Sequence, residues 1–285
     1  MAVMLRLAVP NKGALTEAAQ LMLKEAGYRT RRDSKELVLI DQDNSCELFF
    51  LRPRDIAVYV GEGTLDAGIT GRDMLLDSGA EAEEILPLGF GGSTFRLAAK
   101  SGSLSSVKDL AGLRVATSYT GLLRHYLEES GVDARVIKLD GAVETAIRLG
   151  VADAVADVVE TGTTLRNVGL EVFGEPIMRS EAVLIRQRGA AAEHSGLTQL
   201  VRRLQGVIHA RDFVMMDYDI RAERIEEAIA LTPGMEGPTV SPLHREGWVA
   251  VRAMVRRKGH QQVMDQLWDI GARAILVTDI YACRI

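Results

Sequence analysis

Short apolar strands alternate with amphipathic helices along the first ninety residues, and this alternation constrains the fold more than any other feature. Residues 5–9 form the first strand, and residues 15–26 follow a helical period. A strand over 46–51 runs into Arg52-Pro53, where proline takes a favoured first-turn position of a helix. The strand 65–69 is followed by another helix. This strand–turn–helix succession predicts an α/β lobe with a largely parallel sheet.

A glycine-rich segment, Gly89-Phe90-Gly91-Gly92-Ser93, separates these units from a second set and is typical of a crossover between lobes. Three further strand–helix units follow, including a helix over 142–149. The apolar stretch after Gly169 leads the chain back toward the first lobe. We therefore predict lobe I from residues 1–90 plus about 180–211, and lobe II from residues 91–179.

The last 75 or so residues have a different pattern, in which strands and helices follow the order βαββαβ. The predicted helices span 222–231 and 261–271, between four apolar strands. This order is that of a ferredoxin-like domain, a small sandwich that often serves for binding. We predict such a domain over residues 212–285.

Composition excludes several classes of function. Aromatic residues make up 5% of the chain and the formal charge is −5, so general nucleic-acid binding is not expected. Cys46 and Cys283 are the only cysteines and the five histidines are widely spaced, which argues against a disulfide framework or a dedicated metal site. No apolar stretch has the length of a membrane span. We expect a cytoplasmic protein that does not bind membranes.

The strongest local signal for chemistry lies around an apolar strand over 154–159. That strand delivers Asp157 to the sheet edge where ligands of open α/β sheets bind, and the loop Thr161-Gly162-Thr163-Thr164 leads into helical sequence. Backbone N–H groups at a helix start favour an anion, and Gly162 allows close approach of a phosphate. Asp157 would instead accept hydrogen bonds from ribose hydroxyls. Alternatively, the tetrapeptide is an ordinary βα turn with a capping threonine.

The segment 144–165 resembles the signature of the ATP phosphoribosyltransferase family, the first enzymes of histidine biosynthesis. Three first-lobe segments are also similar to that family: Arg6-Leu-Ala-Val-Pro-Asn-Lys12-Gly13, Leu51-Arg52-Pro53-Arg54-Asp55-Ile56 and Asp66-Ala-Gly68-Ile-Thr-Gly71-Arg72-Asp73. The C-terminal βαββαβ unit resembles the regulatory domain of the family's long form. The resemblance implies a two-lobed body like that of periplasmic binding proteins, followed by the ferredoxin-like domain.

The resemblance also implies a reaction and its site. In the family, N1 of ATP attacks the anomeric carbon of phosphoribosyl pyrophosphate (PRPP), and magnesium pyrophosphate leaves. The implied PRPP-binding residues are Glu144, Asp157, Val158, Thr161, Gly162, Thr163 and Thr164. The expected ATP-binding or pyrophosphate-binding residues are Lys12, Arg52, Gly71, Arg72 and Asp73, although each cation can also be a solvated surface residue. No protein metal site is assigned, because Mg²⁺ binds mainly to phosphates and water in such sites.

The resemblance places the inhibitor L-histidine in the C-terminal domain, at Asp219, Thr239, Met254 and Ala274. A carboxylate suits the ammonium group of a free amino acid, and a hydroxyl suits its carboxylate. The alternative is a domain used only for contacts between subunits of a homo-oligomer, for which we expect a dimer to a hexamer.

Two other functions remain open. A two-lobed α/β body also serves non-enzymatic small-molecule binding or sensor proteins. Another phosphoribosyltransferase is the second alternative, but such enzymes carry two consecutive acidic residues before the phosphate loop. This chain has Ala156-Asp157 there, with one carboxylate.

Overall fold

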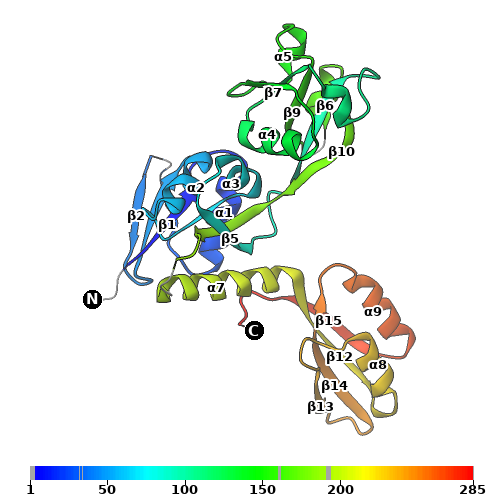
Figure 1. Ribbon diagram of the computed structural model, residues 1–285. Coiled ribbons are helices and arrows are strands. Elements are labelled where there is room, and N and C mark those ends of the chain that lie inside the picture. Colours follow the sequence, from blue (N-terminus) through cyan, green and yellow to red (C-terminus); the bar gives the residue numbers. More distant parts are fainter. Residues whose placement is uncertain (1–3, 32, 34, 160–161, 191–193, 285) are drawn as a thin grey trace. The chain divides into compact units, whose positions relative to one another are not determined.

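The structure is a computed structural model of the 285-residue chain, and it describes residues 4–31, 33, 35–159, 162–190 and 194–284 (Figure 1). Contacts between residues divide the chain into two compact units. The first comprises Met1–Lys24 and Tyr28–Gln199, and the second comprises Glu25–Gly27 and Leu200–Ile285. No helix in the described ranges is long and apolar enough to cross a membrane.

Lobe I of the first unit is built on a sheet with the strand order β2-β3-β1-β4-β11-β5. Its strands are β1 (Leu5–Pro10), β2 (Val38–Asp41), β3 (Cys46–Leu51), β4 (Ala67–Gly71), β5 (Ala82–Pro87) and β11 (Ala182–Gln187), and its helices are α1 (Leu15–Glu25), α2 (Pro53–Gly61) and α3 (Arg72–Ser78). Buried residues of α2, among them Ile56 and Val60, pack against Ala8 of β1 and Val183 of β11. The apolar helix positions thus cover one face of the sheet.

The prediction of a largely parallel sheet is wrong for this lobe. Only β3, β1 and β4 pair in parallel. Strand β2 is antiparallel to β3, and β11 runs antiparallel to both β4 and β5. The reason is topological, because β2 turns directly back into β3 and β11 enters the sheet from lobe II in the opposite direction. Strand β5 was not predicted at all.

Lobe II has a sheet with the strand order β10-β6-β9-β7-β8. Its elements are β6 (Ser93–Lys100), β7 (Arg114–Thr117), α4 (Thr120–Glu129), β8 (Arg135–Lys138), α5 (Thr145–Arg148), β9 (Ala154–Val159), α6 (Thr163–Asn167) and β10 (Leu170–Ser180). Strands β8, β7 and β9 are parallel, whereas β6 and β10 are antiparallel to their neighbours. The predicted helix over 142–149 is reduced to the short α5, and Ala142 at φ +47° lies outside helical geometry.

The chain passes between the two lobes twice, from β5 to β6 and from β10 to β11 (Figure 1). These two connections are hydrogen-bonded to each other. The Leu88 N–H donates to the Ala182 carbonyl at 2.9 Å, and the Ala182 N–H donates to the Phe90 carbonyl at 2.9 Å. Two α/β lobes joined by two adjacent crossings form the architecture of periplasmic binding proteins, which confirms the predicted fold class.

Helix α7 (Ser195–Asp212) leads into the second unit, whose sheet has the order β13-β14-β12-β15. The elements are β12 (Phe213–Arg221), α8 (Ile225–Leu231), β13 (Thr239–Pro242), β14 (Trp248–Arg256), α9 (His260–Asp269) and β15 (Arg273–Asp279). All pairings in this sheet are antiparallel. Buried Ala228 of α8 and Leu267 of α9 pack with Met216, Tyr218 and Val251 on one face. The ferredoxin-like prediction is therefore confirmed.

Candidate functional site

Strand β9 ends in the segment for which the sequence predicts phosphate binding. Asp157 lies half-buried in the last part of β9, and Val158 follows it. The loop then leads through Gly162, whose φ of +71° is a left-handed conformation that glycine adopts without strain, to the start of α6 at Thr163. Thr161 and the side chain of Thr164 lie outside the described residues.

Asp157 lies in an acidic environment. Burial is the main cause that raises the pKa of its carboxyl, and the charges of Glu144 and Asp73 raise it further. The Val158 N–H, which donates to Asp157 Oδ1 at 2.8 Å, and the Arg54 guanidinium lower it. Glu144 and Asp73 come from two other segments of the chain, and the structure brings each of them within electrostatic range of Asp157.

Asp73 is buried near the start of α3, where the two lobes meet. Ser180 Oγ, at the end of β10, donates to Asp73 Oδ1 at 2.7 Å and accepts from the Asp73 N–H at 3.0 Å. Burial raises the pKa of the Tyr119 phenol of lobe II, and the charge and hydrogen bonding of Asp73 raise it further. Gly71, buried at the end of β4, can offer a ligand only its backbone. Asp73 therefore links lobe I to two elements of lobe II.

Arg54 is a candidate site residue that the sequence analysis did not assign. Its guanidinium lies 3.0 Å from Asp77 Oδ2, donates to Ser118 Oγ at 3.2 Å and stacks 4.4 Å from the centre of the Tyr119 ring. It also acts on the pKa of Asp157. The available signal was a cation just after the proline that opens α2. Its partner Ser118 is 64 positions away in the sequence, a separation that local pattern does not reveal.

Lys12 and Arg52 lie at the carboxyl ends of two paired parallel strands. The register pairs Pro10 of β1 with Leu51 of β3, and the Asn11 N–H donates to the Leu51 carbonyl at 2.8 Å. Both cations are exposed. The structure thus brings two of the three predicted phosphate-binding cations to one edge of the sheet, where anions of open α/β sheets bind.

Arg72, the third predicted cation, is engaged by carboxylates. Its Nε and Nη2 donate to the two oxygens of Glu84 at 2.8 Å each, and Nη2 also donates to Glu181 Oε1 at 3.2 Å. Glu181 in turn accepts from the Gly89 N–H at 3.0 Å, so this network joins α3 to both crossings between the lobes. The sequence predicted that the Arg72 guanidinium binds polyphosphate, whereas in the structure it is hydrogen-bonded to two carboxylates of the protein. These bonds favour a structural role for Arg72.

Three of the four residues expected to bind histidine lie on one face of the C-terminal sheet. Asp219 alternates along β12 with residues that pack against the helices, and Met254 does so along β14. Thr239 pairs with Arg252, which occupies the same face of β14 as Met254. Ala274 has φ +51° and lies in a register shift of β15, between the pairs Asp217–Leu276 and Asp219–Arg273, so strand alternation does not assign its side chain to a face. The side chains of Asp219, Thr239 and Met254 therefore belong to the face without helices, in different rows of the sheet.

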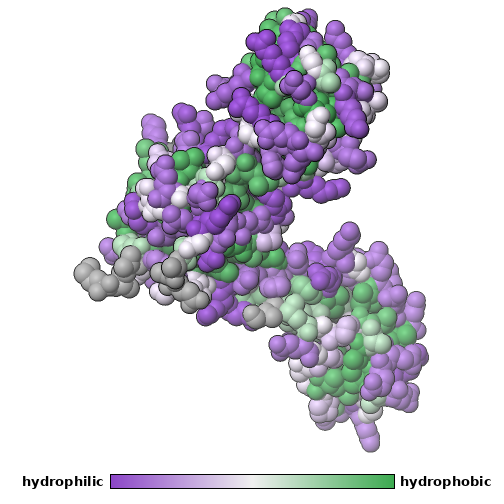
Figure 2. All heavy atoms as spheres, viewed as in Figure 1, coloured by the Kyte–Doolittle hydropathy of each residue, from purple (hydrophilic) through white to green (hydrophobic). Residues whose placement is uncertain are grey.

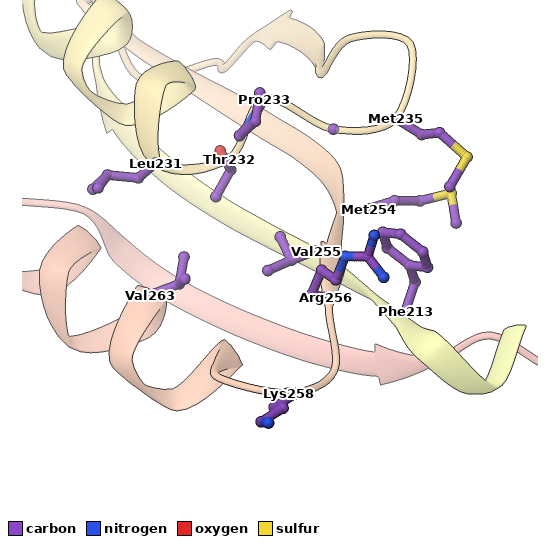
Figure 3. A pocket seen from close by; sticks show the side chains of 11 residues that line it. Phe213, Leu231, Thr232, Pro233, Met235, Met254, Val255, Arg256, Lys258 and Val263 are labelled. Carbon is purple, nitrogen blue, oxygen red and sulfur yellow. The ribbon is translucent and has the colours of Figure 1, made fainter. Parts of the chain in front are cut away.

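A separate cavity of about 490 Å³ lies in the same domain (Figure 3). It is lined by Phe213, Leu231, Thr232, Pro233, Gly234, Met235, Met254, Val255, Arg256, Lys258 and Val263. Figure 3 shows Met235 and Met254 on one side of it, and the Arg256 guanidinium stacks 4.8 Å from the centre of the Phe213 ring. Of the four predicted histidine-binding residues, only Met254 lines this cavity.

Hydrophobic residues are also visible among hydrophilic ones on the surface of this domain (Figure 2). Leu276 on β15 has 61% of its surface exposed, and Trp268 on α9 has 56%.

Within the described ranges, no group of three or more His, Cys, Asp or Glu side chains is arranged to hold a metal ion.

Comparison with known proteins gives concordant results for both parts of the chain. The family described as ATP phosphoribosyltransferase matches residues 52–206, and the family described as "HisG, C-terminal domain" matches residues 210–282. Curated proteins named ATP phosphoribosyltransferase are similar over nearly the whole chain. One from Arthrobacter sp. (strain FB24) is 64% identical and one from Streptomyces avermitilis is 65% identical, each covering 99% of this chain and 100% of the relative.

A solved structure, that of an ATP phosphoribosyl transferase (HisG:HisZ) complex from Thermotoga maritima, is similar to the larger part of the chain. The two sequences are 29% identical, and the structures superpose with a TM-score of 0.63. The match covers 72% of this chain and 98% of that one.

Proposed function

Because the chain belongs to the ATP phosphoribosyltransferase family, we propose that the junction of its two lobes binds PRPP and ATP for the first reaction of histidine biosynthesis. The enzyme transfers the phosphoribosyl group of PRPP to N1 of ATP and releases pyrophosphate. The transition state has oxocarbenium character, so catalysis needs alignment of two anions and neutralisation of the leaving group more than it needs a covalent nucleophile.

The observation that carries the site assignment is the position of Asp157 near the end of β9, just before the loop with Gly162 and within electrostatic range of Glu144 and Asp73. We assign the 5′-phosphate of PRPP to the loop 157–164 and the ribose hydroxyls to Asp157, whose ionised carboxylate accepts their hydrogen bonds. Glu144 lies near enough to orient the same ribose or a metal-bound water. Thr161, Thr163 and Thr164 would add hydroxyl donors to the phosphate.

Lys12 and Arg52 are assigned to the phosphates of ATP or to the departing pyrophosphate. Their exposure and their position at one sheet edge support this role. Mg²⁺ would be held mainly by the phosphates, and Glu144 or Asp73 would accept hydrogen bonds from its water ligands. Bound there, the ion would neutralise negative charge on the leaving group.

We further propose that the protein acts in the cytoplasm as a homo-oligomer of three-domain subunits. The domains are lobe I (1–90 plus about 180–211), lobe II (91–179) and a regulatory domain (212–285). Exposed apolar side chains such as Leu276 on the uncovered sheet face support contacts between regulatory domains of different subunits. Histidine would bind on this face, with its ammonium group on Asp219 and its carboxylate on Thr239.

One assay tests the reaction and its regulation together. Purified protein is mixed with ATP, PRPP and Mg²⁺, with and without histidine, and phosphoribosyl-ATP is identified by mass. Product that histidine suppresses supports both proposals, and product without suppression retains only the catalytic one. No turnover by folded protein would favour a two-lobed binding or sensor protein.

The variant Asp219→Ala separates the effector site from the active site. It should weaken inhibition by histidine, since it removes the carboxylate for the ammonium group, while the uninhibited rate stays within about twofold of the parent. Unchanged inhibition in this variant would locate the effector elsewhere, and the cavity around Met254 would then be the next place to examine.

A further inference from the structure

The carboxylate of Asp77 connects the two lobes directly. Asp77 belongs to α3 of lobe I, and its Oδ1 accepts from the backbone N–H groups of Gly121 and Leu122 at 2.8 and 3.1 Å. Those groups lie in the first turn of α4 in lobe II, whose N-cap residue, Tyr119, makes no side-chain cap of its own. The first turn of a helix normally needs such an acceptor. Lobe I therefore supplies the missing cap of a lobe II helix.

The second carboxylate oxygen of Asp77 is held by Arg54. The Arg54 guanidinium, 3.0 Å from Asp77 Oδ2, also donates to Ser118 of lobe II at 3.2 Å. The Asp77 side chain is only 12% exposed. We call the contacts of Asp77 with Arg54, Gly121 and Leu122 the Asp77 bridge. Both carboxylate oxygens of Asp77 are paired, so separating the lobes would exchange these charge-assisted hydrogen bonds for weaker ones to water.

The absence of a side chain at position 121 makes this approach possible. A Cβ on Gly121 would collide with the carbonyl oxygen of Asp77. The two helices α3 and α4 can therefore meet here only if the residue at 121 is glycine (Figure 1).

The Asp77 bridge adjoins the proposed substrate site. Arg54 stacks on Tyr119, and Asp73 lies beside that ring on the same helix as Asp77. We propose that Asp77 is a positioning residue for the transferase reaction, which holds the lobes together so that Asp73 and Asp157 face the same substrates. This inference rests on the proposed location of the substrates at the lobe junction.

Loss of the bridge should act on substrate affinity rather than on the chemical step. If the lobes separate more often in the free enzyme, fewer molecules are in the closed form that binds PRPP. The apparent affinity then falls in proportion to the fraction of closed molecules. Bound substrates would still close the lobes at saturation. For Asp77→Asn, which keeps an acceptor oxygen but loses the charge toward Arg54, we expect KM for PRPP to rise about tenfold with kcat within about twofold. Asp133→Asn, at an exposed aspartate of lobe II, is the matched control and should change neither constant.

A distance measurement tests the bridge without relying on turnover. Spin labels are attached at Glu62→Cys of lobe I and Lys108→Cys of lobe II, both exposed, in a Cys283→Ser background. Cys46 is buried, and burial raises the pKa of its thiol to about 12, so it should not compete for the label. Labelled subunits are diluted with unlabelled protein so that only distances within one chain are recorded by electron–electron double resonance.

In the free enzyme, Asp77→Asn should lengthen or broaden the distance distribution, and added PRPP should restore it. An unchanged distribution, or a lower kcat with unchanged KM, would overturn the proposal. If the parent protein has no transferase activity, the distances still decide whether Asp77 holds the lobes, so failure of the bridge and failure of the proposed function can be told apart.

Discussion

Replacement of Arg72 by alanine distinguishes a structural role from substrate binding. The substitution removes three hydrogen bonds to Glu84 and Glu181, whose side chains are 27% and 29% exposed beside an Arg72 that is 25% exposed. Removing one partner costs about 3–5 kcal/mol for a fully buried ion pair and about 0–1 kcal/mol for an exposed one. The intermediate exposure leads us to expect a loss of about 2–3 kcal/mol in the free energy of unfolding.

Thermal unfolding measures this loss. For a body of this size, it should lower the unfolding midpoint by about 4–12 °C. Combining Arg72→Ala with Glu84→Gln should cost less than the sum of the two single changes, because the double variant no longer leaves the Glu84 charge unpaired.

Arg52→Ala is the matched control for this experiment. Arg52 is exposed and assigned to phosphates, so its removal should raise KM for ATP or PRPP while the unfolding midpoint stays unchanged. Arg72→Ala should do the reverse, with KM within about twofold of the parent. An unchanged midpoint combined with a tenfold higher KM for Arg72→Ala would refute the structural role and return Arg72 to the substrate site.

Two further predictions concern the phosphate loop. Gly162→Val forces a branched side chain into a left-handed conformation, at a cost of about 1–2 kcal/mol, and should weaken PRPP binding about tenfold by calorimetry while histidine binding is retained. Equal loss of both ligands would indicate misfolding. The pKa of Asp157 is raised in the folded protein above its ordinary value of 3.8, so the folded state holds this proton more tightly than the unfolded state does. The free energy of unfolding therefore falls as the pH rises from 3.8 through the raised pKa. Asp157→Asn should therefore raise the unfolding midpoint at pH 7. It should also lower kcat/KM for PRPP, and the fall of kcat/KM at acid pH that protonation of Asp157 causes in the parent should be absent from the variant. A lower midpoint in this variant would contradict the assigned environment.

Local pattern predicted much of the fold because the apolar positions of each element are also its buried ones. In β3, burial alternates along Cys46–Leu51, and in α2 the buried residues recur at helical spacing. Strand β5 escaped prediction because its sequence, Ala-Glu-Glu-Ile-Leu-Pro, has neither a clear alternation nor a continuous apolar run. Its partner β11 lies about a hundred positions further along the chain.

The site was predictable at the level of segments and less so at the level of side chains. Asp157 and Gly162 stand in a loop whose strand–turn–helix context is visible in the sequence. The partners of Arg72 are not visible there, because Glu181 is 109 positions distant and reaches Arg72 only through the return crossing. Arg54 and Asp77 escaped assignment for the same reason. Long-range ion pairs decide which cations remain available to a ligand, and periodicity carries no information about them.

The place of β11 in the first sheet has a consequence for biosynthesis. This strand lies between β4 and β5, yet it is translated only after all of lobe II. The ribosome needs about 5–20 s to add the residues between β5 and β11. During this time β2, β3, β1 and β4 can pair, but β5 has no partner strand. The second lobe can therefore complete its sheet first. During this interval the nascent N-terminal half exposes the unpaired edges of β4 and β5, which are sites where another chain can pair.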